Sequence, residues 1–423
     1  MIKTSRNNWF GLKCLLIVIS LLIFCNTEAW GQVVNIDSGK QFNTVQSAIF
    51  NARPHESLLV KKGTYLEFDI VVDKPICISA EEKAVIDVQE KGYGFKITAD
   101  SVSIQGLTIK NTGQSYTKDF AAIYVSRSTH FNLQNNQLEN VTFGMLVEKS
   151  KSGSIGGNTI FGTKTVEAAA GNGIHLWDCS EVIITDNEVH HLRDGIYFEF
   201  VTHSLVQGNS SHDNIRYGLH FMFSNNDEYR YNEFTNNGAG VAVMFSKFIN
   251  INHNTFSHNW GTAAYGILLK EIYDTTISYN IIKENTIGIN VEGSTRIDYH
   301  HNELVKNGWA VKVRGACYNN SFTRNNFKYN SFDVSYNSNM NDNNFTQNYW
   351  SNYSGYDLDR DDIGDVPHRP VKLFSYVVNE TPETIILLRS LFVDIIDFSE
   401  KVSPVFTPEE LIDPQPLMNP LKL

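Results

Sequence analysis

The sequence predicts an all-β fold, a right-handed parallel β-helix of about ten coils of roughly 22 residues, and three observations support it. A phrase made of a small residue, an apolar one, any residue and a second apolar one recurs along the chain. A second phrase, Asn followed two positions later by an apolar side chain, keeps nearly the same step. The repeating region shows apolar alternation and no helical pattern. Such short units cannot bury an apolar face alone, so they are expected to stack as coils around one core.

The two phrases stay in register with each other. The first begins at Gly144, Gly173, Gly195, Gly218, Gly240, Gly266 and Gly288, and the second at Asn158, Asn187, Asn232, Asn254, Asn280 and Asn302. The longer steps indicate insertions at residues 161–171 and 260–265, which we expect to emerge as loops. We attribute the recurring Asn and Gly to corners that need left-handed or otherwise permissive backbone.

The chain begins with a pattern typical of a secretory signal peptide. Lys3 and Arg6 precede an apolar run over residues 15–24, and small residues near Ala29 and Gly31 suit cleavage. We assign residues 1–31 to this peptide and expect a periplasmic protein. The remaining Cys77, Cys179 and Cys317 are odd in number and widely scattered, so no disulfide framework is expected.

Residues 32–367 are predicted to form the β-helix, with helical spacing over residues 42–52 indicating a cap on its first coil. Residues 368–423 are predicted to form a C-terminal docking segment. It has a helix over residues 382–401 that is apolar on most sides, followed by a Pro-rich tail. That helix is too short to span a bilayer, so a second protein surface should bury it.

Charge and side-chain type narrow the function classes. The net charge is -11 and the basic residues are dispersed, which argues against a nucleic-acid partner. A polysaccharide lyase or uronate epimerase is the alternative reading for this fold, but it needs acidic residues with a Lys or Arg base on neighbouring coils. A surface adhesin is a third reading, which the apolar C-terminal helix disfavours. We therefore expect a protein that is not an enzyme.

The outward positions of the coils supply candidate metal ligands. Alternation along each strand turns the third residue of the first phrase, and the residue after the phrase, away from the core. His220, Met222 and Met244 are thereby expected to be surface neighbours, and thioether with imidazole is the mixture that selects Cu(I). Further candidates are His175, His203 and His212. The alternative is that the two methionines pack beneath a loop or a partner.

A second candidate site lies near the end of the repeats. Asp357, Asp359, Asp361, Asp362 and Asp365 alternate with other residues around Gly364, as in a calcium-binding loop. The closing bidentate Glu of such a loop is missing. Asp side chains that cap turns explain the run about as well.

Particular segments resemble the NosD family, the periplasmic β-helix factors that mature nitrous oxide reductase. These are residues 218–224 and 240–246, both containing Met, residues 348–367, and residues 387–390 and 413–418. The resemblance implies handling of copper or sulfur cargo. It also implies a partner set: an ABC transporter with a cytoplasmic ATPase and a membrane subunit, a copper-chaperone lipoprotein, and nitrous oxide reductase itself. Asp362 departs from the family pattern, where Gly is more usual, which weakens the calcium reading.

Overall fold

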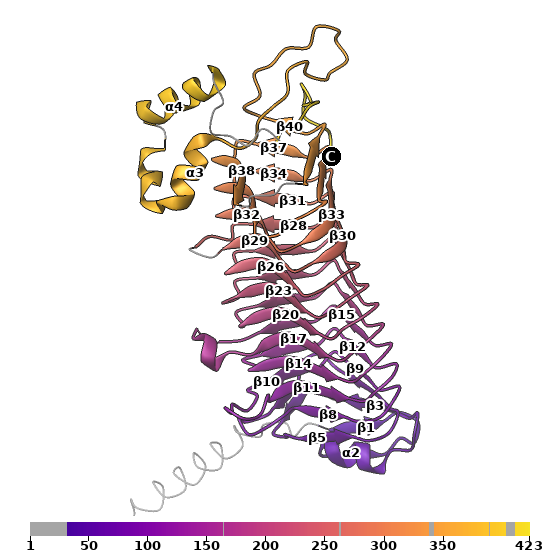
Figure 1. Cartoon of the computed structure of the whole chain (residues 1–423). Helices are drawn as coiled ribbons and strands as arrows, with labels where there is room; N and C mark the ends of the chain where they lie inside the picture. The colour runs from indigo at the N-terminus through magenta and orange to yellow at the C-terminus, as the bar shows by residue number, and fades with distance from the viewer. Residues whose placement is uncertain (1–31, 164, 262–263, 338–341, 389, 403–410) are drawn as a thin grey trace, which may run out of the picture.

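The computed structural model describes residues 32–163, 165–261, 264–337, 342–388, 390–402 and 411–423. The predicted signal peptide, residues 1–31, lies outside this part of the chain. The described residues form a long parallel β-helix whose coils stack from the N-terminal end to the C-terminal end (Figure 1). Each full coil contributes one strand to each of three sheets, here called A, B and C.

The strands pair almost entirely in parallel, coil upon coil. Sheet A contains β4 (Gly63–Tyr65), β7 (Ala84–Asp87), β10 (Thr108–Lys110), β13 (Gln137–Glu139), β16 (Thr159–Phe161), β19 (Glu188–His190), β22 (Ser210–His212), β25 (Glu233–Thr235), β28 (Thr255–Ser257), β31 (Ile281–Lys283), β34 (Glu303–Val305), β37 (Asn326–Lys328) and β40 (Tyr349–Trp350). Sheet B contains β1 (Val33–Asn35), β2 (Gln41–Phe42), β3 (Ser57–Val60), β6 (Cys77–Ala80), β9 (Ser103–Gln105), β12 (Asn132–Gln134), β15 (Ser154–Gly156), β18 (Ile183–Thr185), β21 (Leu205–Gln207), β24 (Glu228–Arg230), β27 (Asn250–Asn252), β30 (Tyr273–Ser278), β33 (Thr295–His300), β36 (Ser321–Thr323) and β39 (Asn344–Thr346). Sheet C contains β5 (Ile70–Val72), β8 (Phe95–Ile97), β11 (Ala121–Ser126), β14 (Phe143–Glu148), β17 (Asn172–Trp177), β20 (Asp194–Glu199), β23 (Tyr217–Met222), β26 (Ala239–Met244), β29 (Tyr265–Lys270), β32 (Ile287–Glu292), β35 (Trp309–Arg314) and β38 (Phe332–Asn337).

The parallel β-helix is confirmed, and it is longer than the recurring phrase indicated, because sheet C has 12 strands. The glycine-led copies of the phrase leave out coils in which another residue occupies the glycine position. By strand register, Ala122 stands in line with Gly144, and Ala310 and Asp333 stand in line with Gly288. The only antiparallel pairings among the described strands are those of β1 with β2 and β3, at the N-terminal end.

Glycine recurs because neighbouring backbones approach closely. A Cβ added to Gly144 would lie 2.4 Å from the carbonyl oxygen of Gly173 on the next coil, and 2.4 Å from a methyl carbon of Ile160. The glycines of the phrase do not have positive φ. Our expectation that corner conformation explains them was therefore wrong, and steric access to the next coil is the reason.

The recurring asparagines form a ladder inside the corner between sheets B and A. In each rung the backbone N–H and the side-chain amide of one Asn both donate to Oδ1 of the Asn on the next coil, as from Asn187 to Asn209 at 2.9 Å. The left-handed residue is the one before each rung, and its type varies from Asp186 to Tyr231 and His253. The asparagines thus satisfy buried backbone groups, which corrects the conformational explanation.

Both ends of the β-helix are covered. Helix α2 (Val45–Asn51) lies at the N-terminal end (Figure 1) and buries Val45, Ala48 and Ile49, as the helical spacing predicted. The prediction began this helix too early, since Phe42 belongs to β2. At the other end residues 411–423 return to the last coil, where Leu417 bridges to Tyr349 and Leu421 hydrogen-bonds with Asn326.

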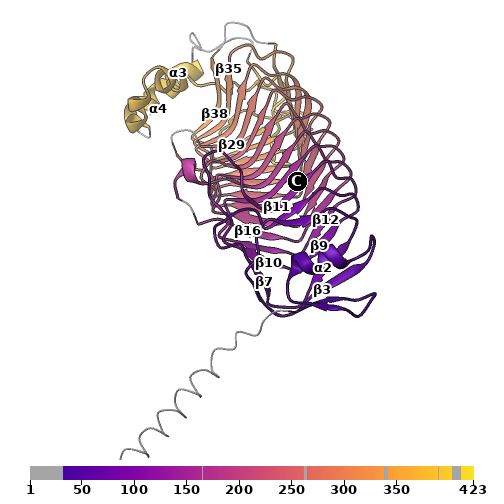
Figure 2. The same ribbon diagram turned by 90° about the horizontal axis from the view of Figure 1, so that it is seen from below.

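The predicted single helix over residues 382–401 is wrong. The chain forms α3 (Leu373–Glu380), the 3-10 helix η2 (Pro382–Leu387) and α4 (Leu391–Val402). Only Thr381 separates α3 from Pro382, whose missing N–H disfavours continuation of the helix. These helices stand beside the strands β35 and β38 (Figures 1 and 2), on the same side as the insertion that carries η1 (Glu167–Ala169).

Candidate functional site

The outer face of sheet C positions the candidate metal ligands in columns that run along the axis. Inward-facing residues such as Ile174 and Leu176 are fully buried, as alternation predicts. Strand register then places His175, Tyr197, His220 and Ala242 side by side in one outward column. A second outward column, two residues further along each strand, contains Trp177, Glu199, Met222 and Met244.

His220 is more enclosed than the sequence indicated. Its side chain was expected at the surface, but the residue is only 6% exposed. The rings of Tyr197 and Tyr217 lie 4.9 Å and 4.7 Å from its own ring, centroid to centroid. Strand alternation alone does not show that flanking aromatic residues cover an outward position, so the sequence argument missed this burial.

A charged pair fixes the orientation of His220. Nδ1 of His220 lies 3.4 Å from Oδ2 of Asp194, which also accepts from Arg216 at 2.6 Å. Burial alone would raise the pKa of Asp194, but the hydrogen bonds from His220 and Arg216 hold it below its ordinary value. Asp194 is thus a carboxylate that accepts from Nδ1, which leaves the lone pair of a neutral imidazole on Nε2.

Nε2 of His220 is buried and has no hydrogen-bond partner, and the same is true of Nε2 of His175. Burial, followed by the charge of Arg193, lowers the pKa of His175 to about 4, so this imidazole is neutral near pH 7. The two nitrogen atoms differ, however. Nδ1 of His175 accepts from the side-chain amide of Asn172 at 3.4 Å, so its Nε2 carries the proton, whereas Nε2 of His220 has an open lone pair. In metal-binding histidines, one ring nitrogen commonly donates to a carboxylate while the other nitrogen binds the metal, and His220 has the same arrangement.

Two thioethers lie beside His220. Met222 is two residues along the same strand, and Met244 is its partner in register on β26. The hydroxyl of Tyr197 donates to Sδ of Met222 at 3.7 Å. Both methionines are half-buried. The structure thus keeps His220, Met222 and Met244 as neighbours, while it places the imidazole at the buried side of the group.

The other two candidate histidines lie elsewhere. His203 is exposed at the corner after sheet C, in the left-handed conformation. His212 belongs to β22 in sheet A, where it contacts Asp213 and Glu188. A residue close to His220 in sequence does not have to lie on sheet C, because each coil passes through all three sheets. Neither residue lies in the sheet C columns that hold the His220 group.

Asp194 and Arg216 were not predicted from the sequence. Asp194 is fully buried at the start of β20, and Arg216 joins it to Glu167 of the insertion at residues 161–171. One sequence feature could have pointed to Asp194, because it stands directly before Gly195, a glycine of the repeated phrase. This position is apolar in several later coils, for example Ile287, so a charged residue there stands out.

The acidic loop is compact. One carboxylate oxygen from each of Asp357, Asp359 and Asp361 lies within 4.8 Å of the others. Asp357 already accepts from the backbone N–H groups of Arg360, Asp361 and Asp362. The capping role expected for these Asp residues is thus present, and calcium binding stays a prediction.

The C-terminal helices contact the β-helix with only part of their apolar surface. Phe374, Val378 and Val393 pack against Ile287, Trp309 and Phe332, which start successive strands of sheet C. Other apolar side chains of these helices are exposed, namely Val377, Ile385, Ile386, Leu387, Leu391, Phe392, Ile395 and Phe398. None of the helices in the described part of the chain has the length and apolar character that crossing a bilayer requires.

Comparison with known proteins identifies similar chains. Residues 157–355 match the family model described as "Periplasmic copper-binding protein (NosD)". The chain is 26% identical to the "Probable ABC transporter binding protein NosD" of Stutzerimonas stutzeri over 367 residues, 82% of this chain and 83% of that protein. It is also 26% identical to the protein of the same name from Pseudomonas aeruginosa over 370 residues, 83% of this chain and 85% of that one.

Solved structures share the fold alone. The catalytic unit of an α-1,3-glucanase from Streptomyces thermodiastaticus superposes with a TM-score of 0.57 at 11% identity, covering 74% of this chain and 65% of that one. The A-module of the mannuronan C-5 epimerase AlgE4 from Azotobacter vinelandii gives 0.51 at 12% identity, covering 71% and 87%. At these identities the enzymes' activities do not transfer to this chain.

Proposed function

Because the chain belongs to the NosD family, we propose that it is a periplasmic, copper-binding accessory protein of an ABC transporter and not an enzyme. In the more specific form of this proposal, it delivers copper or sulfur cargo during the maturation of nitrous oxide reductase. A copper-chaperone lipoprotein supplies the copper, and the transporter consists of a cytoplasmic ATPase and a membrane subunit.

The observation that carries the copper proposal is the open Nε2 of His220 beside two thioethers. Asp194 keeps the proton of His220 on Nδ1, so Nε2 has a lone pair to offer to a soft cation. Met222 and Met244 supply sulfur, which favours Cu(I) over harder ions. Two thioethers and one neutral imidazole leave the charge of the ion uncompensated, which suits cargo that must be released.

Cu(I) titration of the mature protein tests this proposal. His220→Phe, Met222→Leu and Met244→Leu together remove all three ligands and conserve side-chain volume. The matched control is Met145→Leu, since Met145 is fully buried in the core and faces away from the site. We expect the triple variant to lose binding and the control to retain it. Unchanged affinity in a folded triple variant would return the two methionines to a packing role.

We propose that the exposed apolar side chains of η2 and α4 bind the membrane subunit of the transporter. Ile386 is 85% exposed and Leu391 is 74% exposed, although both are large and apolar. A patch of this kind on a soluble domain is typical of a protein interface. The same segment packs on sheet C through Val393, so it is held in a fixed position while it presents this patch.

Surface substitutions test the transporter interface better than truncation, because residues 411–423 also cover the last coil. Ile386→Asp with Leu391→Asp should abolish copurification with the transporter and leave the β-helix folded. Phe50→Asp is the matched control, because Phe50 is 78% exposed on α2 at the opposite end. A folded double variant that the transporter still retains would contradict this interface.

A further inference from the structure

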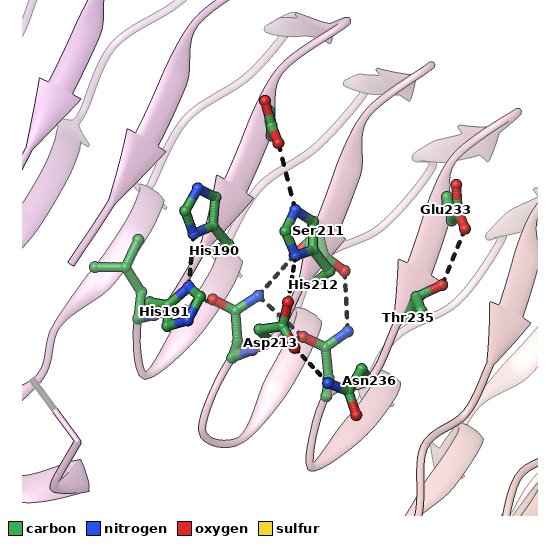
Figure 3. Close-up of polar contacts among 12 residues, drawn as sticks. His190, His191, Ser211, His212, Asp213, Glu233, Thr235 and Asn236 are labelled. Carbon is green, nitrogen blue, oxygen red and sulfur yellow. Dashed lines mark hydrogen bonds and ion pairs between the residues drawn. The ribbon is translucent and has the colours of Figure 1, made fainter. Parts of the chain in front are cut away.

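A cluster of imidazoles lies on the outer face of sheet A, away from the site described above. His190 ends β19, His191 follows it, and His212 with Asp213 occupies the matching positions one coil further (Figure 3). Glu188 lies on the same strand as His190. Five side chains of metal-ligand type thus gather on two adjacent coils.

The first two histidines face each other although they are adjacent in sequence. In a regular strand, neighbouring side chains point to opposite faces. His191 has φ of 57°, which ends the strand and turns its ring to the side of His190. The two Nδ1 atoms lie 2.6 Å apart, and the ring planes cross at 78° (Figure 3). One proton is therefore shared between two nitrogen lone pairs, and both lone pairs point into the same space.

The next coil adds a third imidazole and negative charge. The ring of His212 stacks on that of His190 with centroids 4.9 Å apart. Nδ1 of His212 lies 2.7 Å from Asp213, and its Nε2 lies 3.5 Å from Glu188. Two carboxylates thus stand close to the imidazoles, where they favour a bound cation.

An incoming ion can reach the imidazoles from solvent. The side chains remain accessible, since His191 is exposed and His190 and His212 are half-buried. An ion reaches the pair without any movement of the coils.

We propose that His190 and His191 bind a divalent transition-metal ion, Zn(II) or Cu(II), through their Nδ1 atoms, and that the carboxylates of Glu188 and Asp213 beside His212 favour the bound cation by their charge. Imidazole with carboxylate suits these borderline ions, whereas the Met222 and Met244 pair suits Cu(I). The two sites lie on different sheets. The β-helix therefore carries a nitrogen-rich site for divalent ions in addition to the sulfur-containing one.

Substitutions that preserve local structure test this site. His190→Phe keeps the ring stack, because Phe161 already stacks on His190 from the preceding coil. His191→Asn keeps a residue that tolerates the left-handed conformation. The matched control is His301→Asn. His300 and His301 form a similar pair with Nδ1 atoms 3.1 Å apart, but the ring stacked on this pair is that of Tyr279 and not an imidazole.

The measurement is titration of the mature protein with Zn(II) by calorimetry and with Cu(II) by electron paramagnetic resonance. Changes in the surroundings of a ligand cost 10- to 100-fold in affinity, so loss of a ligand should cost roughly 100-fold or more. We expect both site variants to lose affinity and nitrogen hyperfine coupling, and the control to retain them. Unchanged binding in the site variants, or an equal loss in the control, would overturn the proposal. Cu(I) binding by the His190 variant, measured under reducing conditions, reports separately on the methionine site.

Discussion

Asp413 closes the asparagine ladder at the C-terminal end, so replacing it with Ala should destabilise the last coils. Oδ2 of Asp413 accepts from the backbone N–H of Asn348 at 2.9 Å, from its side-chain amide at 3.1 Å and from the indole N–H of Trp350 at 3.0 Å. Oδ1 accepts from the backbone of Gln347 and Gln415. Asp413 is fully buried.

The expected cost follows from these contacts. Asp413→Ala leaves three buried donors without an acceptor, and each stranded donor costs about 1 to 3 kcal/mol. Water that enters the end of the β-helix recovers part of this, so we expect a loss of about 3 to 5 kcal/mol in the free energy of unfolding. Because each coil contacts only its neighbours, amide protection should fall first in the last coils.

Guanidinium denaturation and hydrogen exchange of the mature chain measure this effect. The control is Asn419→Ala, which removes one exposed hydrogen bond to Asp362 and should change stability by less than about 0.5 kcal/mol. A loss of under about 1 kcal/mol for Asp413→Ala, or uniform loss of protection along the chain, would refute the assignment of Asp413 as the terminal rung.

Three further substitutions test the packing argument. Burial raises the pKa of Asp227 from 3.8 to about 8, although the hydrogen bond from the backbone N–H of Ser204 lowers it. The unfolded chain therefore releases this proton at lower pH than the folded chain, so stability should fall as the pH rises from about 4 to 8. Asp227→Asn should flatten that dependence and add up to about 4 kcal/mol at pH 7 in urea titrations, and an unchanged pH profile would contradict the ionisation argument. Gly144→Ala should cost about 2 to 4 kcal/mol because its Cβ meets the carbonyl of Gly173, and a neutral melting temperature would argue against close approach. Tyr229→Phe removes a buried hydroxyl without a partner and should be neutral or stabilising by about 1 kcal/mol, so clear destabilisation would reveal an acceptor.

Much of the fold could be predicted from periodicity. Ile174 and Leu176 had to face inward because alternation along a strand has a period of two, and the spacing of Gly144, Gly173 and Gly195 fixed the coil length. The same register made Met222 and Met244 neighbours. The reason given for glycine and asparagine was wrong, because a one-dimensional pattern shows that a residue recurs without showing what lies on the next coil.

The sequence by itself determined the β-helix, the position of its N-terminal cap and the pairing of the two methionines, because these follow from strand alternation and repeat length. Only the tertiary structure decided that Asp194 orients His220, that His190 and His191 turn their rings together, and that Asp413 ends the ladder. The first contact depends on side-chain rotation and the second on the left-handed backbone of His191. The third depends on a chain that returns across 65 residues. Sequence periodicity contains no information on any of the three, since it registers only which positions face the core.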